Sequence, residues 1–135
     1  AVCRQSVEAS RTGLMSADVT EIFSPERVAS VCREFGLEPG LSMDIKSGYD
    51  FDSKRDRDRC WEALKRDKPT LVIGSPTCTL FSKLQELNKF MYMDDEMWML
   101  KFQERMEQAK RYVEFCAKIY QHQIDNNRYF LHEHP

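Results

Sequence analysis

The 135 residues suffice for one domain with its own hydrophobic core, and 41% hydrophobic with 31% charged residues is typical of a globular protein. The net charge of −2 excludes the overall positive field that drives non-specific nucleic-acid binding. Five widely spaced cysteines without a C-x-x-C pair argue against a disulfide framework or a zinc site. We find no membrane span or signal peptide, so we expect no membrane partner and an intracellular protein, cytoplasmic or nuclear and not secreted.

The domain organisation is simple. Residues 1–17 have no clear hydrophobic period and are interpreted as a lead-in segment, followed by a single domain over residues 18–135. The chain stops at His134-Pro135 directly after a strand-like segment, so we expect a fragment truncated at its C-terminus. A sheet that is cut after a strand leaves an open edge. We therefore expect a homo-oligomer that forms through this edge.

The first elements predict a strand, a helix and a second strand. Val19–Phe23 contains β-forming residues and predicts a strand. Ser24 is expected to cap the following helix, with Pro25 at its first position and Gly36 at its end. Residues 40–45 predict the second strand. These three elements form a βαβ unit with parallel strands and a right-handed crossover.

The central part of the chain predicts a charged helix followed by a buried strand. The helix covers residues 53–66, and its run KRDRDR (54–59) alternates in sign, which favours a solvated helix face over a nucleic-acid patch. Leu71–Ile73 is an apolar run that predicts a strand, and Gly74–Pro76 predicts the turn that ends it. Cys78 follows this turn directly.

The last third predicts a long helix and a final strand. Residues 83–93 are interpreted as a linker helix or an ordered loop. Asp94 or Asp95 can cap a helix that runs to about Asn126. One apolar stripe follows this helix, and we expect it to pack on the sheet rather than bind a partner helix. Its members are Met99, Phe102, Met106, Ala109, Val113, Cys116 and Tyr120. Residues 128–131 predict the last strand.

The order of these elements predicts an α/β fold: a Rossmann-like, doubly wound, mainly parallel sheet of about four strands with flanking helices. In such a sheet the carboxyl ends of the strands line one crevice. Chemically useful side chains follow four predicted strands at this edge, and they are Phe23 with Ser24, Asp44 with Asp50, Cys78, and Glu133. A thiol and a carboxylate brought together here could act as a nucleophile and a proton-handling partner.

Three segments resemble the cytosine-5 DNA methyltransferases. Gly74–Ser82, GSPTCTLFS, is similar to the nucleophile motif of this family, which usually reads Gly-Gly-Pro-Pro-Cys-Gln-x-Phe-Ser. Phe130–Pro135, FLHEHP, resembles the later Phe-x-x-Glu-Asn-Val segment, and Ile22–Ser24 resembles the Leu-Phe-Ser of the first strand. The order fits from about residue 18 to residue 135. The chain also resembles methyltransferase-like segments embedded in retroelement polyproteins.

This resemblance implies a partial methyltransferase fold, S-adenosylmethionine as the cofactor and DNA as a partner. Cys78 would add as a thiolate to carbon 6 of a flipped cytosine, and Glu133 would hydrogen-bond the ring nitrogen. Carbon 5 would then take the methyl group of the cofactor. The residues implied to bind the cofactor are Phe23, Asp44, Asp50 and Pro76.

Two interpretations remain open from the sequence. Residues 24–27, SPER, stand where the family carries a glycine-rich loop, and this favours a non-catalytic interaction or structural module of a larger polyprotein. Cys78 could be an ordinary buried residue and Glu133 a solvated one. His132 and His134 flank Glu133, but no further ligand completes a set, so no metal site is predicted.

Overall fold

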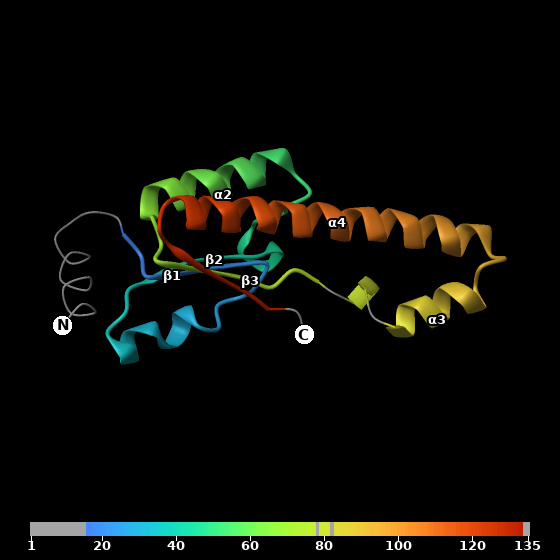
Figure 1. Ribbon diagram of the computed structural model, residues 1–135, viewed down its shortest axis with the longest axis horizontal. Helices are drawn as coiled ribbons and strands as arrows, with labels where there is room; N and C mark the ends of the chain where they lie inside the picture. Colours follow the sequence, from blue (N-terminus) through green and yellow to red (C-terminus); the bar gives the residue numbers. More distant parts are fainter. Residues whose placement is uncertain (1–15, 78, 82, 134–135) are drawn as a thin grey trace.

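The protein has a four-stranded parallel sheet at its centre. The computed structural model describes residues 16–77, 79–81 and 83–133. The sheet order is β2-β1-β3-β4, and every pair of neighbours is parallel (Figure 1). The strands are β1 (Val19–Ile22), β2 (Pro39–Met43), β3 (Leu71–Gly74) and β4 (Tyr129–His132). The predicted α/β class and the flanking helices are confirmed, and the arrangement is consistent with a Rossmann-like fold.

Two helices, α2 (Lys54–Asp67) and α4 (Glu96–Asp125), cover the same face of the sheet (Figure 1). The main hydrophobic core lies between them and the strands. Its fully buried members include Ile22, Met43 and Val72 from the strands, Cys60 and Leu64 from α2, and Cys116 and Ile119 from α4. Burying one such large apolar side chain contributes about 1.5–3 kcal/mol, so this layer supplies most of the stability of the fold.

Among the described residues, the opposite face carries a short 3₁₀-helix, η1 (Ala29–Phe35), over a small cluster formed by Val19, Cys32 and Ile73. The predicted helix start at Ser24 is wrong. The Ser24 hydroxyl donates to the Pro25 carbonyl at 2.8 Å instead of capping a helix, and the helical turns begin at Ala29. The predicted end at Gly36 is confirmed, because this glycine adopts φ +73°.

The charged helix α2 agrees with the prediction to within one residue. It is preceded by the short 3₁₀-turn η2 (Ile45–Ser47) and has Ser53 at its N-cap position. Its charge run pairs within the helix: Lys54 Nζ lies 2.6 Å from Asp58, and Arg59 Nη1 lies 2.8 Å from Asp56. These local pairs confirm the predicted solvated face.

The long helix α4 begins where Asp95 accepts a hydrogen bond from the Trp98 N–H at 3.0 Å, which confirms the predicted cap. The predicted apolar stripe is only partly right, because Val113 is 37% exposed while Phe115 and Ile119 are buried. The last members of the stripe, Cys116 and Tyr120, are buried, and Phe115 joins them because its ring contacts Trp61 of α2 at a centroid distance of 6.2 Å. None of the helices in the described segments is long and apolar enough to span a membrane.

The first half of α4 extends past the sheet and is accompanied there by α3 (Lys83–Met91), which follows the short 3₁₀-turn η3 (Thr79–Phe81) (Figure 1). We call this projecting part, residues 83–104, the arm. The linker predicted at residues 83–93 is therefore helical over most of its length.

Candidate functional site at the carboxyl edge of the sheet

The strand order places a topological switch point between β1 and β3. From β1 the chain crosses to β2 on one side, and from β2 it returns to β3 on the other side of β1. In an open sheet of this order the two connections leave in opposite directions, and a crevice is expected between the loops that follow the two strands. Open α/β sheets bind their ligands at such points.

Glu133 lies at this edge and joins three loops. Its backbone N–H donates to the Gly74 carbonyl at 2.9 Å, which extends the β3–β4 pairing by one residue. Its carboxylate accepts a hydrogen bond from the Ser75 hydroxyl at 3.0 Å and lies 3.8 Å from Arg27 Nη1. Both charged side chains are about half exposed, so the ion pair contributes little stability and the carboxylate stays accessible.

Glu21, which was not among the predicted site residues, organises the loop after β1. Its carboxylate is fully buried and accepts hydrogen bonds from the backbone N–H groups of Arg27, Val28 and Ala29 at 3.0, 3.2 and 3.1 Å. The Ser42 hydroxyl of β2 is a fourth donor at 3.1 Å. A strand residue therefore caps η1, and Ser24 does not. The sequence signal that could have revealed this role is a carboxylate within a strand, VTEI, that is buried along its whole length.

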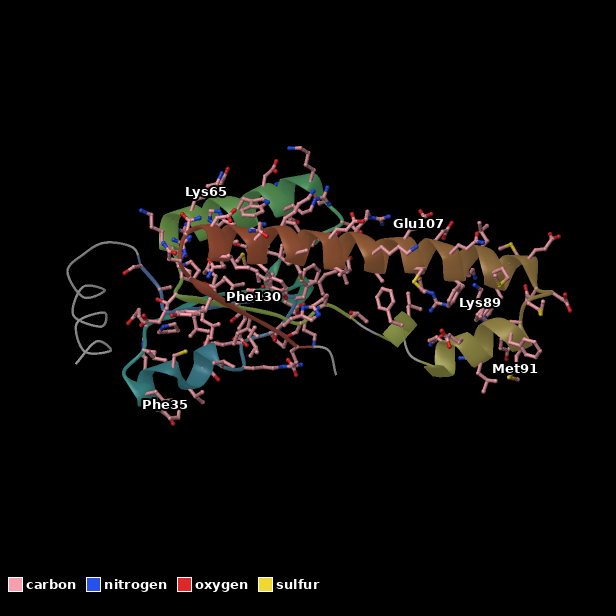
Figure 2. The ribbon with its side chains drawn as sticks, in the orientation of Figure 1. Phe35, Lys65, Lys89, Met91, Glu107 and Phe130 are labelled. Carbon is pink, nitrogen blue, oxygen red and sulfur yellow. The ribbon has the colours of Figure 1, made fainter. Side chains whose placement is uncertain are left out.

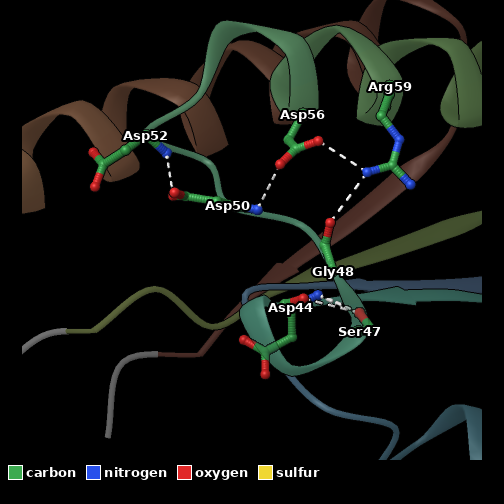
Figure 3. A network of polar contacts seen from close by, with 7 residues as sticks. All are labelled: Asp44, Ser47, Gly48, Asp50, Asp52, Asp56 and Arg59. Carbon is green, nitrogen blue, oxygen red and sulfur yellow. Dashed lines mark hydrogen bonds and ion pairs between the residues drawn. The ribbon is translucent and has the colours of Figure 1, made fainter.

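Asp44 and Asp50 lie in the connection between β2 and α2, which is held by a network of polar contacts (Figure 3). The Asp44 N–H donates to Ser47 Oγ at 2.9 Å, while its carboxylate points away from the rest of the network. The Asp50 carboxylate accepts the Asp52 N–H at 3.0 Å, and its own N–H donates to Asp56 at 3.0 Å. The Arg59 hydrogen bond lowers the pKa of Asp56, so this anchor is ionised at neutral pH.

A hollow of about 330 Å³ lies beside Asp44 at the carboxyl edge. Pro25 and Glu26 from the loop after β1 form one wall, and Ser42 and Lys46 contribute to the other. Its volume is near the lower end, roughly 300 Å³, of pockets that hold small ligands. Asp44 is therefore placed where a ligand could reach it, and it shares this hollow with the loop that carries Arg27.

Phe23 and Pro76 lie in packed positions. Phe23 has φ +58°, and its ring packs against Phe51 and Tyr112 at centroid distances of 4.6 and 4.9 Å. It therefore joins the aromatic cluster beneath α4. Pro76 is fully buried. Both residues support the loops of the carboxyl edge through packing.

The predicted nucleophile Cys78 lies outside the described residues. Its neighbours Thr77 and Leu80 line a second hollow of about 290 Å³, which is closed on its other side by Arg105 and Tyr112 of α4. The Tyr112 hydroxyl donates to Asp52 Oδ2 at 3.0 Å, and burial together with this carboxylate raises the pKa of Tyr112 to about 12. Tyr112 is therefore a neutral hydrogen-bonding group in this wall at physiological pH, and Arg105 is its positive charge.

The described cysteines are unsuited to nucleophilic chemistry. Burial raises the pKa of Cys60 and of Cys116 to about 12, and it also raises the pKa of Cys32. These thiols remain protonated at neutral pH and act as small packing groups. Across residues 16–77, 79–81 and 83–133, no group of three or more His, Cys, Asp or Glu side chains is placed to hold a metal ion.

Comparison with known proteins gives no relative for this chain. No protein-family model matches it, and no curated protein or solved structure matches it significantly. The function of the chain must therefore be inferred from its fold and from the residues at the carboxyl edge.

Proposed function

We propose that this chain is a methyltransferase-like domain of the cytosine-5 DNA methyltransferase type, with its reaction site at the carboxyl edge. One observation carries the proposal: the Glu133 carboxylate accepts the Ser75 hydroxyl at 3.0 Å, and Ser75 is three residues before Cys78. The predicted acid and the loop of the predicted nucleophile thus meet at the carboxyl edge of the sheet, although the two contacting residues are 58 positions apart in sequence.

The residues at this edge fit the nucleoside half of S-adenosylmethionine. Asp44 follows β2 and lines the 330 Å³ hollow, where a carboxylate can accept hydrogen bonds from the two hydroxyls of a ribose. For the amino-acid half, Glu26 and Arg27 supply a negative and a positive side chain that complement an ammonium and a carboxylate group. S-adenosylmethionine would supply an electrophilic methyl group on a sulfonium sulfur.

In this mechanism the chain provides the covalent and proton chemistry on the base. The Cys78 thiolate forms a bond to carbon 6 of an extruded cytosine, and negative charge moves into the ring. Glu133, protonated on Oε1, would donate a hydrogen bond to the ring nitrogen and stabilise that charge, while its Oε2 accepts the Ser75 hydroxyl and lies 3.8 Å from Arg27 Nη1. After carbon 5 takes the methyl group, loss of its proton to water and expulsion of the Cys78 thiolate restore the aromatic ring.

A second candidate is a non-catalytic module with the same fold. It is favoured by the loop after β1, in which Pro25 has no N–H and Glu21 already binds the N–H groups of residues 27–29. This loop offers few free backbone donors for a cofactor. In that case the edge residues would serve packing, and a protein partner would take the place of DNA.

Cofactor titration separates the two candidates. We expect S-adenosylmethionine to bind the wild-type chain in calorimetry and to raise its thermal midpoint, since about 2.7 kcal/mol of stabilisation follows at a ligand concentration 100 times the dissociation constant. The Asp44→Asn variant should lose most of the binding, whereas Glu62→Gln on the exposed side of α2 should keep it. Absence of binding at millimolar cofactor would exclude methyl transfer.

A covalent trap then tests the nucleophile. A DNA duplex with 5-fluorocytosine should form a stable adduct with the wild-type chain in the presence of S-adenosylmethionine, because fluorine at carbon 5 blocks release of the enzyme. The Cys78→Ser variant should form none, and Cys3→Ser, in the predicted lead-in, should react like the wild type. An adduct that survives Cys78→Ser would contradict the assignment.

A further inference from the structure

A hollow of about 330 Å³ lies between α2 and α4, away from the carboxyl edge. Its charged lining consists of Lys54, Arg57 and Asp58 from α2 and Arg111, Glu114 and Lys118 from α4. Four of these side chains are positive and two are negative, whereas the whole chain has a net charge of −2. Because the low-dielectric walls of a hollow concentrate the field of such charges, an anion is attracted to this place.

Arg57 is the fixed positive charge of this hollow. Its Nη1 atom donates to the carbonyl oxygens of Phe51 and Asp52 at 2.7 and 2.8 Å, so the half-buried guanidinium is held in place by neutral groups. Within the part of the chain that the structure describes, no ion pair includes Arg57 or Lys118. The charge of Arg57 is therefore not neutralised by a carboxylate. Its Nε and Nη2 atoms still carry N–H donors, whose forked geometry matches the oxygens of a phosphate group.

The apolar part of the hollow is aromatic and consists of Phe51, Trp61 and Phe115. Trp61 is half-buried, and its indole is held by edge-to-face contacts with Phe115 at 6.2 Å and with His122 at 5.4 Å between ring centroids. A planar ring of a ligand can stack on such an indole, as nucleic-acid bases stack on aromatic side chains. The volume is near the lower end, roughly 300 Å³, of small-ligand pockets, which suits one ring with one phosphate group.

We propose that this hollow binds a nucleotide, with its phosphate group on Arg57 and Lys118 and its base on Trp61. The chemistry that the hollow recognises is a phosphate group beside a planar ring. A free mononucleotide and one nucleotide of a single strand both have this chemistry. The hollow lies between the two helices that cover one face of the sheet (Figure 1), so this site is separate from the reaction site proposed above and does not depend on it.

Uridine 5′-monophosphate is the probe, because it contains neither the base nor the cofactor of the reaction proposed above. The indole N–H signal of Trp61 in ¹H–¹⁵N NMR spectra reports its binding, and the Trp98→Phe variant identifies this signal because the chain has two tryptophans. We expect the signal to shift with a dissociation constant of about 0.1–1 mM at low salt, and added salt should weaken the binding. An unshifted Trp61 signal at about 10 mM uridine 5′-monophosphate would overturn the proposal.

Two half-ligands test whether both parts of the nucleotide are recognised. Uridine lacks the phosphate group and ribose 5-phosphate lacks the base, so each should bind at least about tenfold more weakly than uridine 5′-monophosphate. Ribose 5-phosphate that binds as tightly as the nucleotide would contradict the stacking on Trp61. Uridine that binds as tightly would contradict the phosphate contact with Arg57 and Lys118.

Charge substitutions test the position of the phosphate group. Arg57→Gln should weaken binding of uridine 5′-monophosphate about tenfold, because charge-assisted hydrogen bonds are lost. Since Arg57 also holds the loop before α2, two further variants are needed: Lys118→Gln should weaken binding about threefold, and Glu114→Gln should strengthen it about twofold. Lys89→Gln is the matched control, because Lys89 is as exposed to solvent as Lys118 but lies on α3 in the arm (Figure 2), so it should leave binding unchanged. Binding that neither Lys118→Gln nor Glu114→Gln alters would refute the assignment.

A thymidylate hexamer without a terminal phosphate distinguishes the two sources of the nucleotide. If the hollow receives one nucleotide of a strand, the hexamer should shift the Trp61 signal at a lower concentration than uridine 5′-monophosphate does and should depend more steeply on salt. If the ligand is a free mononucleotide, only uridine 5′-monophosphate should shift this signal, because its terminal phosphate group carries more charge than a bridging one.

Discussion

Substitution of Gly74 by alanine should destabilise the fold through a single side chain of α4. Gly74 ends β3, and a Cβ atom built on it would overlap the hydroxyl oxygen of Tyr120 and lie 2.9 Å from its Cζ. Tyr120 is only 9% exposed, stacks on Phe130 at a centroid distance of 4.4 Å, and bonds His132 Nδ1 through its hydroxyl at 2.7 Å. The ring therefore cannot move aside without losing these contacts.

The expected loss follows from two contributions. Overpacking a well-packed site costs about 1–3 kcal/mol, and the hydrogen bond between Tyr120 and His132 contributes about 1 kcal/mol more. We therefore expect Gly74→Ala to lower the free energy of unfolding by about 2–4 kcal/mol. This packing requirement explains the glycine at position 74 without reference to catalysis.

Urea unfolding followed by far-UV circular dichroism measures this loss. Tyr120→Phe alone should cost about 1 kcal/mol, and in the double variant the two losses should not add, because removal of the hydroxyl relieves part of the overlap. The expected coupling energy between the two substitutions is about 1–2 kcal/mol. The relief is only partial, because the contact between the new Cβ atom and Cζ of residue 120 remains. A Gly74→Ala variant within about 0.5 kcal/mol of the wild type, or fully additive losses, would refute this account of Gly74.

Two further predictions concern residues that hold the fold together. Glu21→Gln should lower the free energy of unfolding by about 2–4 kcal/mol, because an amide cannot accept all the hydrogen bonds of the buried carboxylate, and the exposed neighbour Glu26→Gln should change it by less than about 0.5 kcal/mol. Burial, followed by the nearby positive charges, lowers the pKa of His122 below its usual value of about 6.5, so the unfolded chain binds more protons there and stability should fall as the pH drops from 7 towards 5. The difference in unfolding free energy between the wild type and His122→Gln should shrink over the same range, and parallel pH profiles would count against it.

Local signals in the sequence predicted the regular elements well. Asp95 caps α4, Gly36 ends η1, and the alternating charges of residues 54–59 lie on a solvated helix face. Each of these features depends on side chains and backbone groups within about one helical turn, so the residues involved are close together in the sequence. The predicted helix start at Ser24 is wrong because Glu21, three residues earlier in β1, binds the amides of residues 27–29.

The candidate site was predicted only in part for the same reason. The strand order makes Glu133 a neighbour of Ser75. Residue patterns do not predict this order, because the sequence pattern of a buried strand is the same whichever strand lies beside it. Arg27 was not among the predicted site residues, because its partner Glu133 lies near the other end of the chain in sequence. Phe23 lies at the predicted edge, but its positive φ places its ring among the aromatic residues of the core.

Residue patterns alone predict the α/β class, the approximate bounds of the strands and long helices, and the residues that follow each strand. These depend on hydrophobic period, turn residues and caps, which act over a few positions. The folded chain is needed to find the sheet order, the role of Glu21 as a cap, the fit of Tyr120 against Gly74, and the outward position of Leu87, Phe90 and Met91 on α3. The sheet order and the fit of Tyr120 against Gly74 arise from contacts between distant segments, whose free energies depend on which groups lose water together when the chain packs.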